Sequence, residues 1–289
     1  MGSRRRAVMA ATGLGIGLTA AATTAAAQEL EQVWETEALL RVPESVAWDP
    51  ARHVLYVSNI AGDFQTKDGV GFVSVLTPEG EIRDLEWVDG LNAPKGLAVS
   101  GDRLYVADMD ELVEIDIPHA KIVARHRPEG AQFLNGIDVA PDGSVYVTDS
   151  FAARIYRLRH GEVETWFADP ALGGINGIIA EAGRLVSGSF QSGGVWEIDL
   201  GTKAVHPLAE GLGAFDGIVS DGEGGYFLSD WAGRVFASDL SGPEAAPETL
   251  LDTREASKSA ADIEYVPSLE LLLVPTFGAN RVTAYRLKD

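Results

Sequence analysis

Residues 134–158 read LNGIDVAPDGSVYVTDSFAARIYRL and form the unit from which the rest of the chain is built. Two short runs of β-branched and aromatic residues, NGIDVA and SVYVTDS, are joined by a Pro-Asp-Gly turn, and a third run, RIYRL, follows a short polar link. This pattern predicts a three-stranded β-meander. A lone meander leaves its apolar faces uncovered, so we expect stacked copies of it.

Five further copies are present along the chain. Aligned on the residue that opens the first strand, the units start at Glu44, Lys95, Asn135, Asn176, Asp216 and Ala261. The steps between those starts are 51, 40, 41, 40 and 45 residues. A period of this length fits about four strands per unit, which is typical of a propeller blade. The sequence therefore predicts an all-β, six-bladed β-propeller.

The two ends of the chain predict how the ring closes. The last unit stops after its third strand, RVTAYRL at residues 281–287, while EQVWETEALL at residues 31–40 resembles the outer strand EVETWF at residues 162–167. We expect the N-terminal strand to join the last blade and leave no open sheet edge. Residues 28–289 are then a single propeller domain.

Residues 1–27 are typical of an export signal. MGSRRR is a basic start, a weakly apolar Ala/Gly segment follows, and three alanines at residues 25–27 offer a cleavage site. The run of arginines before a core of low hydrophobicity favours a twin-arginine signal. We expect a periplasmic or secreted protein, with no insertion into the membrane once the signal is removed.

The composition excludes some partners. The formal charge is -20, and it becomes about -23 without Arg4, Arg5 and Arg6, because residues 1–27 hold no acidic residue. Such an acidic surface repels nucleic acid and anionic lipid and attracts cations. The chain has no cysteine, so its stability must come from the core. No oligomeric state is indicated.

Four of the six unit starts carry an oxygen donor. Because equivalent positions of the inner strands converge at one end of a propeller channel, Glu44, Asn135, Asn176 and Asp216 are expected to meet there. Two carboxylates and two amides suit a hard cation such as calcium, and the lack of nitrogen and sulfur ligands disfavours zinc. The sequence predicts one divalent cation in the channel.

Two alternatives to this metal site stay open at the level of sequence. Asn-Gly and Asp-Gly pairs also form turns that lead into strands, although Glu44 shares the position without a following glycine. The ammonium of Lys95, at the same position of the second unit, could neutralise Glu44 or Asp216 and replace the ion. Its long stem could instead reach outward.

These motifs resemble a known family. The PES of VPESVAWD, the NG of LNGIDVAPDG, the NG of INGIIA and the FDG of FDGIVSDGEGG resemble the blade starts of the regucalcin/gluconolactonase family and of the related paraoxonases. The resemblance covers essentially all of residues 28–289. It implies a six-bladed propeller with calcium in the channel, and Glu44, Asn176 and Asp216 as ligands. Asn135 is implied to be a further ligand or a substrate-contacting amide.

The chain also departs from that family. Gluconolactonases carry an arginine two residues before the position of Asn135, where this chain has Phe133. An apolar ring there favours a less polar lactone or ester over a sugar lactone. No histidine stands at a blade start, so the histidine relay of paraoxonases is not evident; the five histidines fall in predicted turns or outer strands, at His53, His119, His126, His160 and His206.

A second recurring feature resembles NHL-type propellers. Asp149 and Asp230 end second strands and are followed four or five residues later by Arg154 and Arg234, a pair that ties a turn to the third strand. Asp108 holds the same position without such an arginine. Without that arginine partner, Asp108 is the member of the set that we single out as a channel-mouth carboxylate.

Two functions follow as hypotheses. The first is a calcium-dependent hydrolase of a small lactone or ester, in which Asp216 is the general base that the resemblance implies, Asp108 or Asp149 is an alternative base, and Lys95, Asn135 and Phe133 contact the substrate. The alternative is a non-catalytic binding propeller of NHL type with a structural channel metal; a lyase is a third class.

The mouth of the channel distinguishes these functions. A hydrolase needs a concave, partly apolar pocket there, whereas a binding module needs a broad exposed apolar patch. Aromatic side chains near strand ends are candidates to line a pocket, namely Phe133, Phe190, Trp231 and Phe277. The inserted segment IAGDFQTKDGVG at residues 60–71 is a candidate lid.

Overall fold

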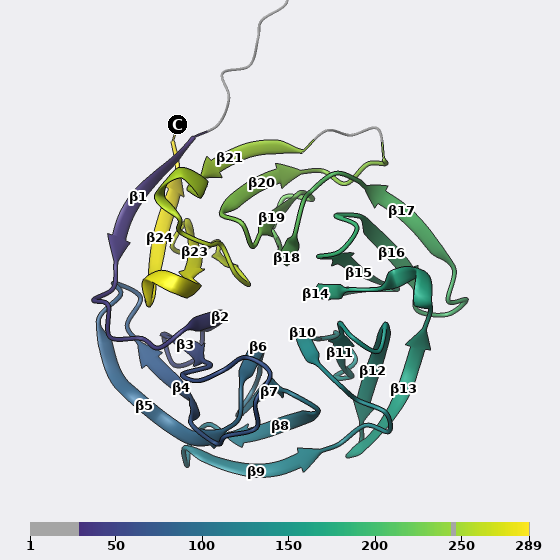
Figure 1. The fold of residues 1–289 in the computed structure, drawn as a ribbon, viewed down its shortest axis with the longest axis horizontal. Helices are drawn as coiled ribbons and strands as arrows, with labels where there is room; N and C mark the ends of the chain where they lie inside the picture. Colours follow the sequence, from purple (N-terminus) through teal and green to yellow (C-terminus); the bar gives the residue numbers. More distant parts are fainter. Residues whose placement is uncertain (1–28, 244–246, 289) are drawn as a thin grey trace, which may run out of the picture.

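The computed structural model describes residues 29–243 and 247–288. Within these ranges the strands form six four-stranded antiparallel sheets, arranged side by side around a central axis (Figure 1). The predicted six-bladed β-propeller is confirmed. In blades 1 to 5 the innermost strand comes first and holds the residue at which the repeat starts, whereas in blade 6 that residue, Ala261, lies just before the innermost strand.

The strands of the six blades follow one another from the inside outward, except in the last blade. Blades 1 and 2 consist of β2 (Pro43–Asp49), β3 (Val54–Asn59), β4 (Gly71–Leu76), β5 (Ile82–Leu91), β6 (Pro94–Ser100), β7 (Arg103–Asp108), β8 (Glu111–Asp116) and β9 (Lys121–His126). Blades 3 and 4 consist of β10 (Leu134–Val139), β11 (Val145–Asp149), β12 (Arg154–Arg159), β13 (Glu162–Ala168), β14 (Ile175–Glu181), β15 (Arg184–Ser189), β16 (Val195–Asp199) and β17 (Val205–Ala209). Blades 5 and 6 consist of β18 (Phe215–Ser220), β19 (Tyr226–Asp230), β20 (Arg234–Ser238), β21 (Glu248–Asp252), β22 (Glu264–Val266), β23 (Leu271–Thr276), β24 (Arg281–Leu287) and β1 (Leu30–Glu35).

Three single-turn 3-10 helices connect strands in the described ranges: η1 (Pro170–Leu172), η2 (Arg254–Ala256) and η3 (Phe277–Ala279). The second of them lies in the polar segment between β21 and β22. No helix in the part of the chain that the structure describes is long and apolar enough to cross a membrane. The predicted signal at residues 1–27 lies outside the described residues.

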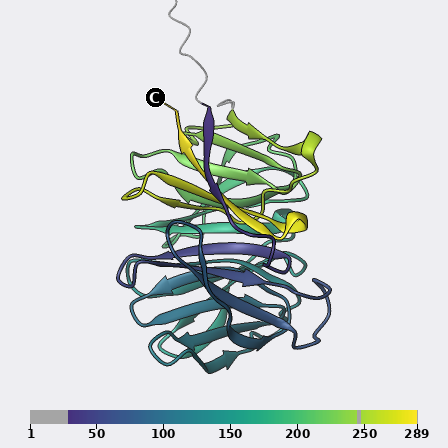
Figure 2. The ribbon, with the colours of Figure 1, turned by 90° about the vertical axis from the view of Figure 1, so that its left-hand side faces the viewer.

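The ring is closed by the N-terminal strand, as predicted. β1 pairs antiparallel with β24, from Leu30 opposite Leu287 to Glu35 opposite Thr283. Figure 2 shows the two strands, the first in purple and the last in yellow, side by side at the seam. The sixth sheet therefore contains both ends of the described chain, and the outer edge of β24 is covered.

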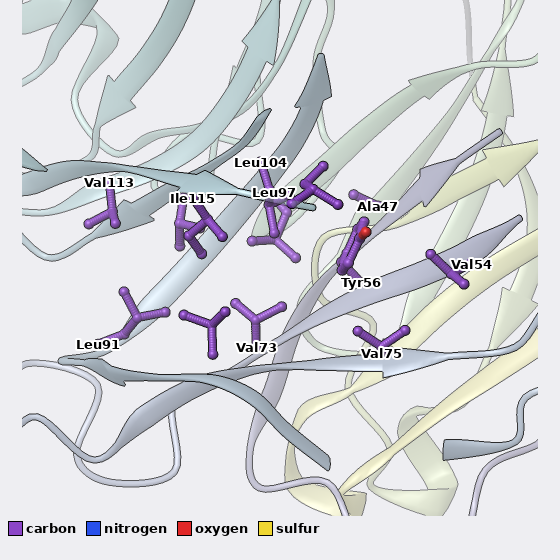
Figure 3. Packing of buried hydrophobic residues seen from close by; sticks show 13 residues of the cluster. Ala47, Val54, Tyr56, Val73, Val75, Leu91, Leu97, Leu104, Val113 and Ile115 are labelled. Atoms are coloured by element: carbon purple, nitrogen blue, oxygen red, sulfur yellow. The ribbon is translucent and has the colours of Figure 1, made fainter. Parts of the chain in front are cut away.

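Apolar side chains fill the space between neighbouring blades. The cluster between blades 1 and 2 includes Tyr56, Val73, Leu97, Leu104 and Ile115, all buried (Figure 3). Equivalent clusters lie between the other pairs of neighbours. The last of them joins blade 6 to blade 1, so the apolar core continues around the whole ring.

Glycines allow the inner strands to pack closely around the axis. Gly96, Gly136, Gly177 and Gly217 each follow a residue at which a repeat starts, and a Cβ on any of them would collide with the neighbouring inner strand. In the described chain these four glycines lie within strands and have no positive φ. The Asn-Gly and Asp-Gly pairs are therefore not turns. They mark close contacts between blades.

Gly177→Ala should destabilise the protein, although alanine normally suits a strand better than glycine. The added methyl group would collide with the backbone carbonyl oxygen of Asp216 in the next blade. We expect a loss of about 1–3 kcal/mol, the usual cost of overpacking, measured by urea unfolding. Gly278→Ala is the control, because nothing lies within 4 Å of its Cβ position and its φ is not positive. Equal stability of the two variants would contradict the close contact.

Candidate functional site

The structure gathers the polar repeat starts at one end of the channel. We call Glu44, Lys95, Asn135, Asn176 and Asp216, together with Ala261, the channel ring. The five polar side chains are buried, with exposed fractions between 2% for Lys95 and 7% for the two asparagines. They lie on inner strands that run side by side, and blades 6 and 1 meet through a parallel bridge between Asp262 and Ser45.

Hydrogen bonds orient the two amides of the ring. Asn135 Nδ2 donates to Ser150 Oγ at 3.2 Å, and Asn176 Nδ2 donates to Asp216 Oδ1 at 2.9 Å. The nitrogen of each amide is thereby used within the protein. The amide oxygens accept no hydrogen bond from the described residues and are left for a donor or a cation.

The two carboxylates of the ring form no ion pair within the described residues, and Lys95 acts on Glu44 only from a distance. Glu44 Oε2 is buried without a hydrogen-bond partner in the described residues. Burial, followed by repulsion from Asp216 and Asp262, raises the pKa of Glu44 well above its usual range. Burial and the charge of Asp262 likewise raise the pKa of Asp216 well above its usual range, against the hydrogen bond from Asn176. A cation at this position would remove both penalties.

Lys95 does not supply the missing positive charge by direct contact. Its ammonium is not within 4.0 Å of any carboxylate oxygen in the described residues. The side chain reaches outward instead, where Nζ donates to the backbone oxygen of Ala93 at 2.9 Å and lies 4.1 Å from the centre of the Phe133 ring. Burial lowers the pKa of Lys95 to about 8, with Glu44 and Asp108 acting in the opposite direction.

The sixth blade contributes a residue that the sequence reasoning missed. Ala261 has no polar side chain, but the next residue, Asp262, takes the place that glycine holds in four other blades. Its Oδ2 accepts a hydrogen bond from Ser45 Oγ at 2.8 Å, and its backbone N–H donates to the carbonyl of Glu44 at 2.9 Å. In the sequence, this contact could have been recognised from the two repeats that have no glycine after the starting residue, those at Ala261 and Glu44.

Aromatic side chains pack beside Lys95 of the channel ring and form contacts with one another. Phe133 is 7% exposed, stacks on Phe151 with 4.3 Å between ring centres, and meets the edge of Phe64 at 6.3 Å. Trp231 packs edge-on against Phe277 at 5.9 Å. Phe64, Phe151 and Trp231 each remain about half exposed. Phe190, another predicted lining residue, follows β15 and is partly buried.

The inserted loop at residues 60–71 contacts the ring. The backbone oxygen of Phe64 lies 3.4 Å from Lys95 Nζ, and Lys67 forms an ion pair with Asp110. In Figure 1 this dark blue loop passes over the start of β6. The loop therefore lies where a lid would, although its movement stays a prediction.

The carboxylates at the ends of the second strands have structural partners. Asp149 accepts four backbone N–H groups, and Asp230 accepts two and pairs with Arg234 at 2.7 Å. Asp108 was expected to lack an arginine partner, and this is wrong. It is fully buried, accepts the N–H groups of Asn92 and Ala93, and pairs with Arg125 of β9 at 3.4 Å. A catalytic role for Asp108 or Asp149 stays a prediction.

A second acidic group lies deeper in the channel. A cavity of about 140 Å³ is lined by apolar inner-strand residues and by Asp138, Asp262 and Glu264. Asp138 accepts the N–H groups of Val139 and Ala180, both at 2.7 Å. Burial raises the pKa of Asp138 to about 6 and that of Glu264 to about 8, where repulsion by the other two carboxylates adds to the effect.

These raised pKa values predict how stability depends on pH. An unfolded glutamate titrates near pH 4.3, whereas Glu264 titrates at about 8 in the folded protein. Between those values the folded state holds a proton that the unfolded state has released, so the free energy of unfolding should fall as the pH rises. Glu264→Gln should flatten that fall between about pH 6 and pH 8.

Urea unfolding in chelator, repeated across the pH range, measures this effect. The exposed Glu162→Gln is the matched control and should follow the parent. A Glu264→Gln profile as steep as that of the parent would show that Glu264 is not protonated in the folded state.

The donor set of the ring fits calcium. In residues 29–243 and 247–288, no group of three or more histidine, cysteine, aspartate or glutamate side chains is arranged to hold a metal ion. A cation in the ring would therefore depend on two carboxylates and two amide oxygens. The orphaned Glu44 Oε2 and the free amide oxygens suit a hard cation. The histidines lie in turns or outer strands, as expected.

Comparison with known proteins supports the fold. No family model matches the sequence, and no curated protein matches it. Among solved structures, a gluconolactonase from Xanthomonas campestris is similar with a TM-score of 0.69 at 18% identity, over 90% of each chain. A luciferin-regenerating enzyme has a TM-score of 0.65 at 16% identity, over 91% of this chain and 95% of the other.

A third similar structure comes from a different class of enzyme. Virginiamycin B lyase from Staphylococcus aureus, solved with quinupristin, has a TM-score of 0.65 at 12% identity, over 90% of this chain and all of the other. At these identities the likeness concerns the fold. It confirms the propeller that the resemblance to gluconolactonases implied, and it leaves the reaction to be argued from the site.

Proposed function

We propose that this protein is a calcium-dependent hydrolase of a small lactone or ester. The observation that carries the proposal is the channel ring, where two buried carboxylates form no ion pair within the described residues and two amides keep their oxygens free. The gluconolactonase and the luciferin-regenerating enzyme supply an analogy for enzymatic action on this fold.

Glu44, Asn135, Asn176 and Asp216 would hold the ion. When bound, calcium supplies a Lewis acid that polarises the substrate carbonyl. Asn176 fixes Asp216 by the hydrogen bond to Oδ1, which leaves Oδ2 available. Oδ2 would take a proton from the attacking water, although a nearby cation weakens this base by lowering its pKa.

The reaction balances without another reactant. The water oxygen bonds to the carbonyl carbon, the bond from that carbon to the alkoxy oxygen breaks, and the proton taken by Asp216 is passed to the leaving oxygen. An ester gives a carboxylic acid and an alcohol, and a lactone gives a hydroxy acid; the acid then releases its proton to water and leaves as the carboxylate. Phe133, with Phe64 and Phe151 beside it, favours substrates with an apolar body over sugar lactones.

A panel of alkyl lactones, sugar lactones and aryl esters tests the proposal. The purified protein should hydrolyse the apolar members with calcium, lose that activity in chelator, and regain it when calcium is restored. Activity that is unchanged in chelator would show that hydrolysis does not depend on calcium. Absence of turnover on the whole panel, in a protein that binds calcium, would favour the second candidate.

That second candidate is a binding propeller of NHL type with a structural channel metal. The half-exposed Phe64, Phe151 and Trp231 favour it, because exposed aromatic residues are typical of protein-binding surfaces. The cavity of about 140 Å³ does not decide the question, since it lies deeper in the channel than the ring.

A further inference from the structure

Two opposite charges in the channel ring, Glu44 and Lys95, form no direct ion pair in the described residues. Glu44 Oε2 is buried and accepts no hydrogen bond from the described residues. Lys95 belongs to the same ring and is 2% exposed, yet no carboxylate of the described chain approaches its Nζ within 4.0 Å. A buried Lys-Glu pair would normally close to reduce the cost of burial. Here the two groups stay apart, so each is available to a ligand of opposite charge.

The contacts of the Lys95 ammonium show how much of its bonding capacity is free. An ammonium has three donors. One donates to the Ala93 carbonyl at 2.9 Å, another makes only a 3.4 Å contact with the Phe64 carbonyl, and the third faces Met109 Sδ at 3.9 Å. An anionic oxygen would accept a shorter and stronger bond than either of the last two.

The weak contact is made by the inserted loop. Because the Phe64 carbonyl belongs to residues 60–71, a ligand oxygen could replace it by a small displacement of that loop, without disturbing a strand. A second contact near the middle of the loop, the ion pair between Lys67 and Asp110, does not involve the ring.

The surroundings of the Lys95 ammonium indicate what such an anion would carry. The ammonium lies over the face of Phe133, which stacks on the half-exposed Phe151. An apolar group attached to the anion would therefore meet aromatic rings.

We infer that the channel mouth is a binding site for a small monocarboxylate with an apolar body, in which the ammonium of Lys95 binds the carboxylate and Phe133, Phe64 and Phe151 contact the body. The inference deepens the proposed function and rests on it for the cation in the ring, since a carboxylate is the product of lactone or ester hydrolysis. Lys95 then sets which products and acidic substrates are retained.

Calorimetric titration with phenylacetate tests the site directly, without any turnover. Phenylacetamide is the neutral probe of the same shape. With calcium present, we expect phenylacetate to bind at least about tenfold more tightly than phenylacetamide. In chelator, binding of phenylacetate should be weaker, because Glu44 and Asp216 then repel it, but its preference over the amide should persist.

Lys95→Met keeps the length of the stem and removes the charge. It should abolish the preference for phenylacetate in both media and weaken phenylacetamide binding much less, because the neutral amide loses only a hydrogen bond. Lys67→Met is the matched control. It removes the ammonium of a lysine in the inserted loop, and that ammonium does not contact the ring. Hydrogen exchange of residues 62–70 should increase when phenylacetate binds to the parent, because the Phe64 contact is released.

Several results would overturn the inference. They are equal affinity of the parent for both probes, unchanged phenylacetate binding by Lys95→Met, or an equal loss in Lys67→Met. Phenylacetate that binds only with calcium and is indifferent to Lys95→Met would be held by the ion alone. If Lys95→Met does not fold, the comparison of the two probes on the parent decides. Binding without hydrolysis of any ester would refute the proposed function and leave the site standing.

Discussion

Asp216→Asn is expected to abolish hydrolysis, with a fall in kcat of roughly 10²–10⁴-fold, the usual contribution of a general base. The amide keeps the size of the side chain and an oxygen donor but cannot take a proton from water. It also removes one of the two negative charges of the ring, so calcium should bind at least about tenfold more weakly. The loss of hydrolysis should persist at calcium concentrations that refill the site.

Two variants separate this effect from a loss of structure. Asp89→Asn changes an exposed carboxylate on β5 and should leave both calcium affinity and hydrolysis unchanged. Asp149→Asn should lower the melting temperature, because Asp149 accepts four backbone N–H groups, while calcium affinity is kept. Retained hydrolysis and calcium binding in Asp216→Asn, together with their loss in Asp149→Asn, would place the site at the ends of the second strands instead.

Glu44→Gln should have opposite effects in the absence and presence of calcium. Without the ion, the variant removes a buried carboxylate whose Oε2 has no partner and which Asp216 and Asp262 repel, so the protein should become more stable. With calcium at about a hundredfold above its dissociation constant, the parent should gain roughly 2.7 kcal/mol. The variant should lose most of that gain.

Thermal and urea unfolding of the parent and of Glu44→Gln, each in chelator and in calcium, measure the four stabilities. Glu162→Gln, an exposed glutamate on β13, should respond to calcium as the parent does. If chelator and added calcium leave the parent unchanged, the ring holds no calcium. A Glu44→Gln variant that is less stable than the parent in chelator would show that Glu44 has a partner in solution.

The sequence was sufficient to predict the ring architecture because the repeat is local. Alternating β-branched residues and the Pro-Asp-Gly turn define each strand pair, and the steps of about 40 residues define the blades. Glu44, Asn135, Asn176 and Asp216 could be placed together because they share one position in that repeat. Closure by β1 followed from the missing fourth strand of the last unit.

Contacts between blades could not be read from the repeat. The position of the Lys95 ammonium could not be predicted, because it depends on which carbonyl oxygens lie within reach of a flexible side chain. In the structure these belong to Ala93 and to Phe64 of the inserted loop. Arg125, the partner of Asp108, comes from β9, 17 residues along the chain, and not from the turn where the NHL pattern places an arginine. The role of the glycines stayed open at the level of sequence for the same reason, because the atoms that their Cβ would meet belong to the next blade.

The seam between β1 and β24 has a consequence for how the chain folds. Leu30 and Leu287 lie at opposite ends of the described propeller, so their pairing closes a very long loop and must wait until β24 has been synthesised. Until the two strands pair, β24 presents an unpaired edge with free N–H and C=O groups. A nascent or N-terminally trimmed chain would offer that edge to the first strand of another copy, and head-to-tail exchange of this strand is the route by which such a ring would polymerise.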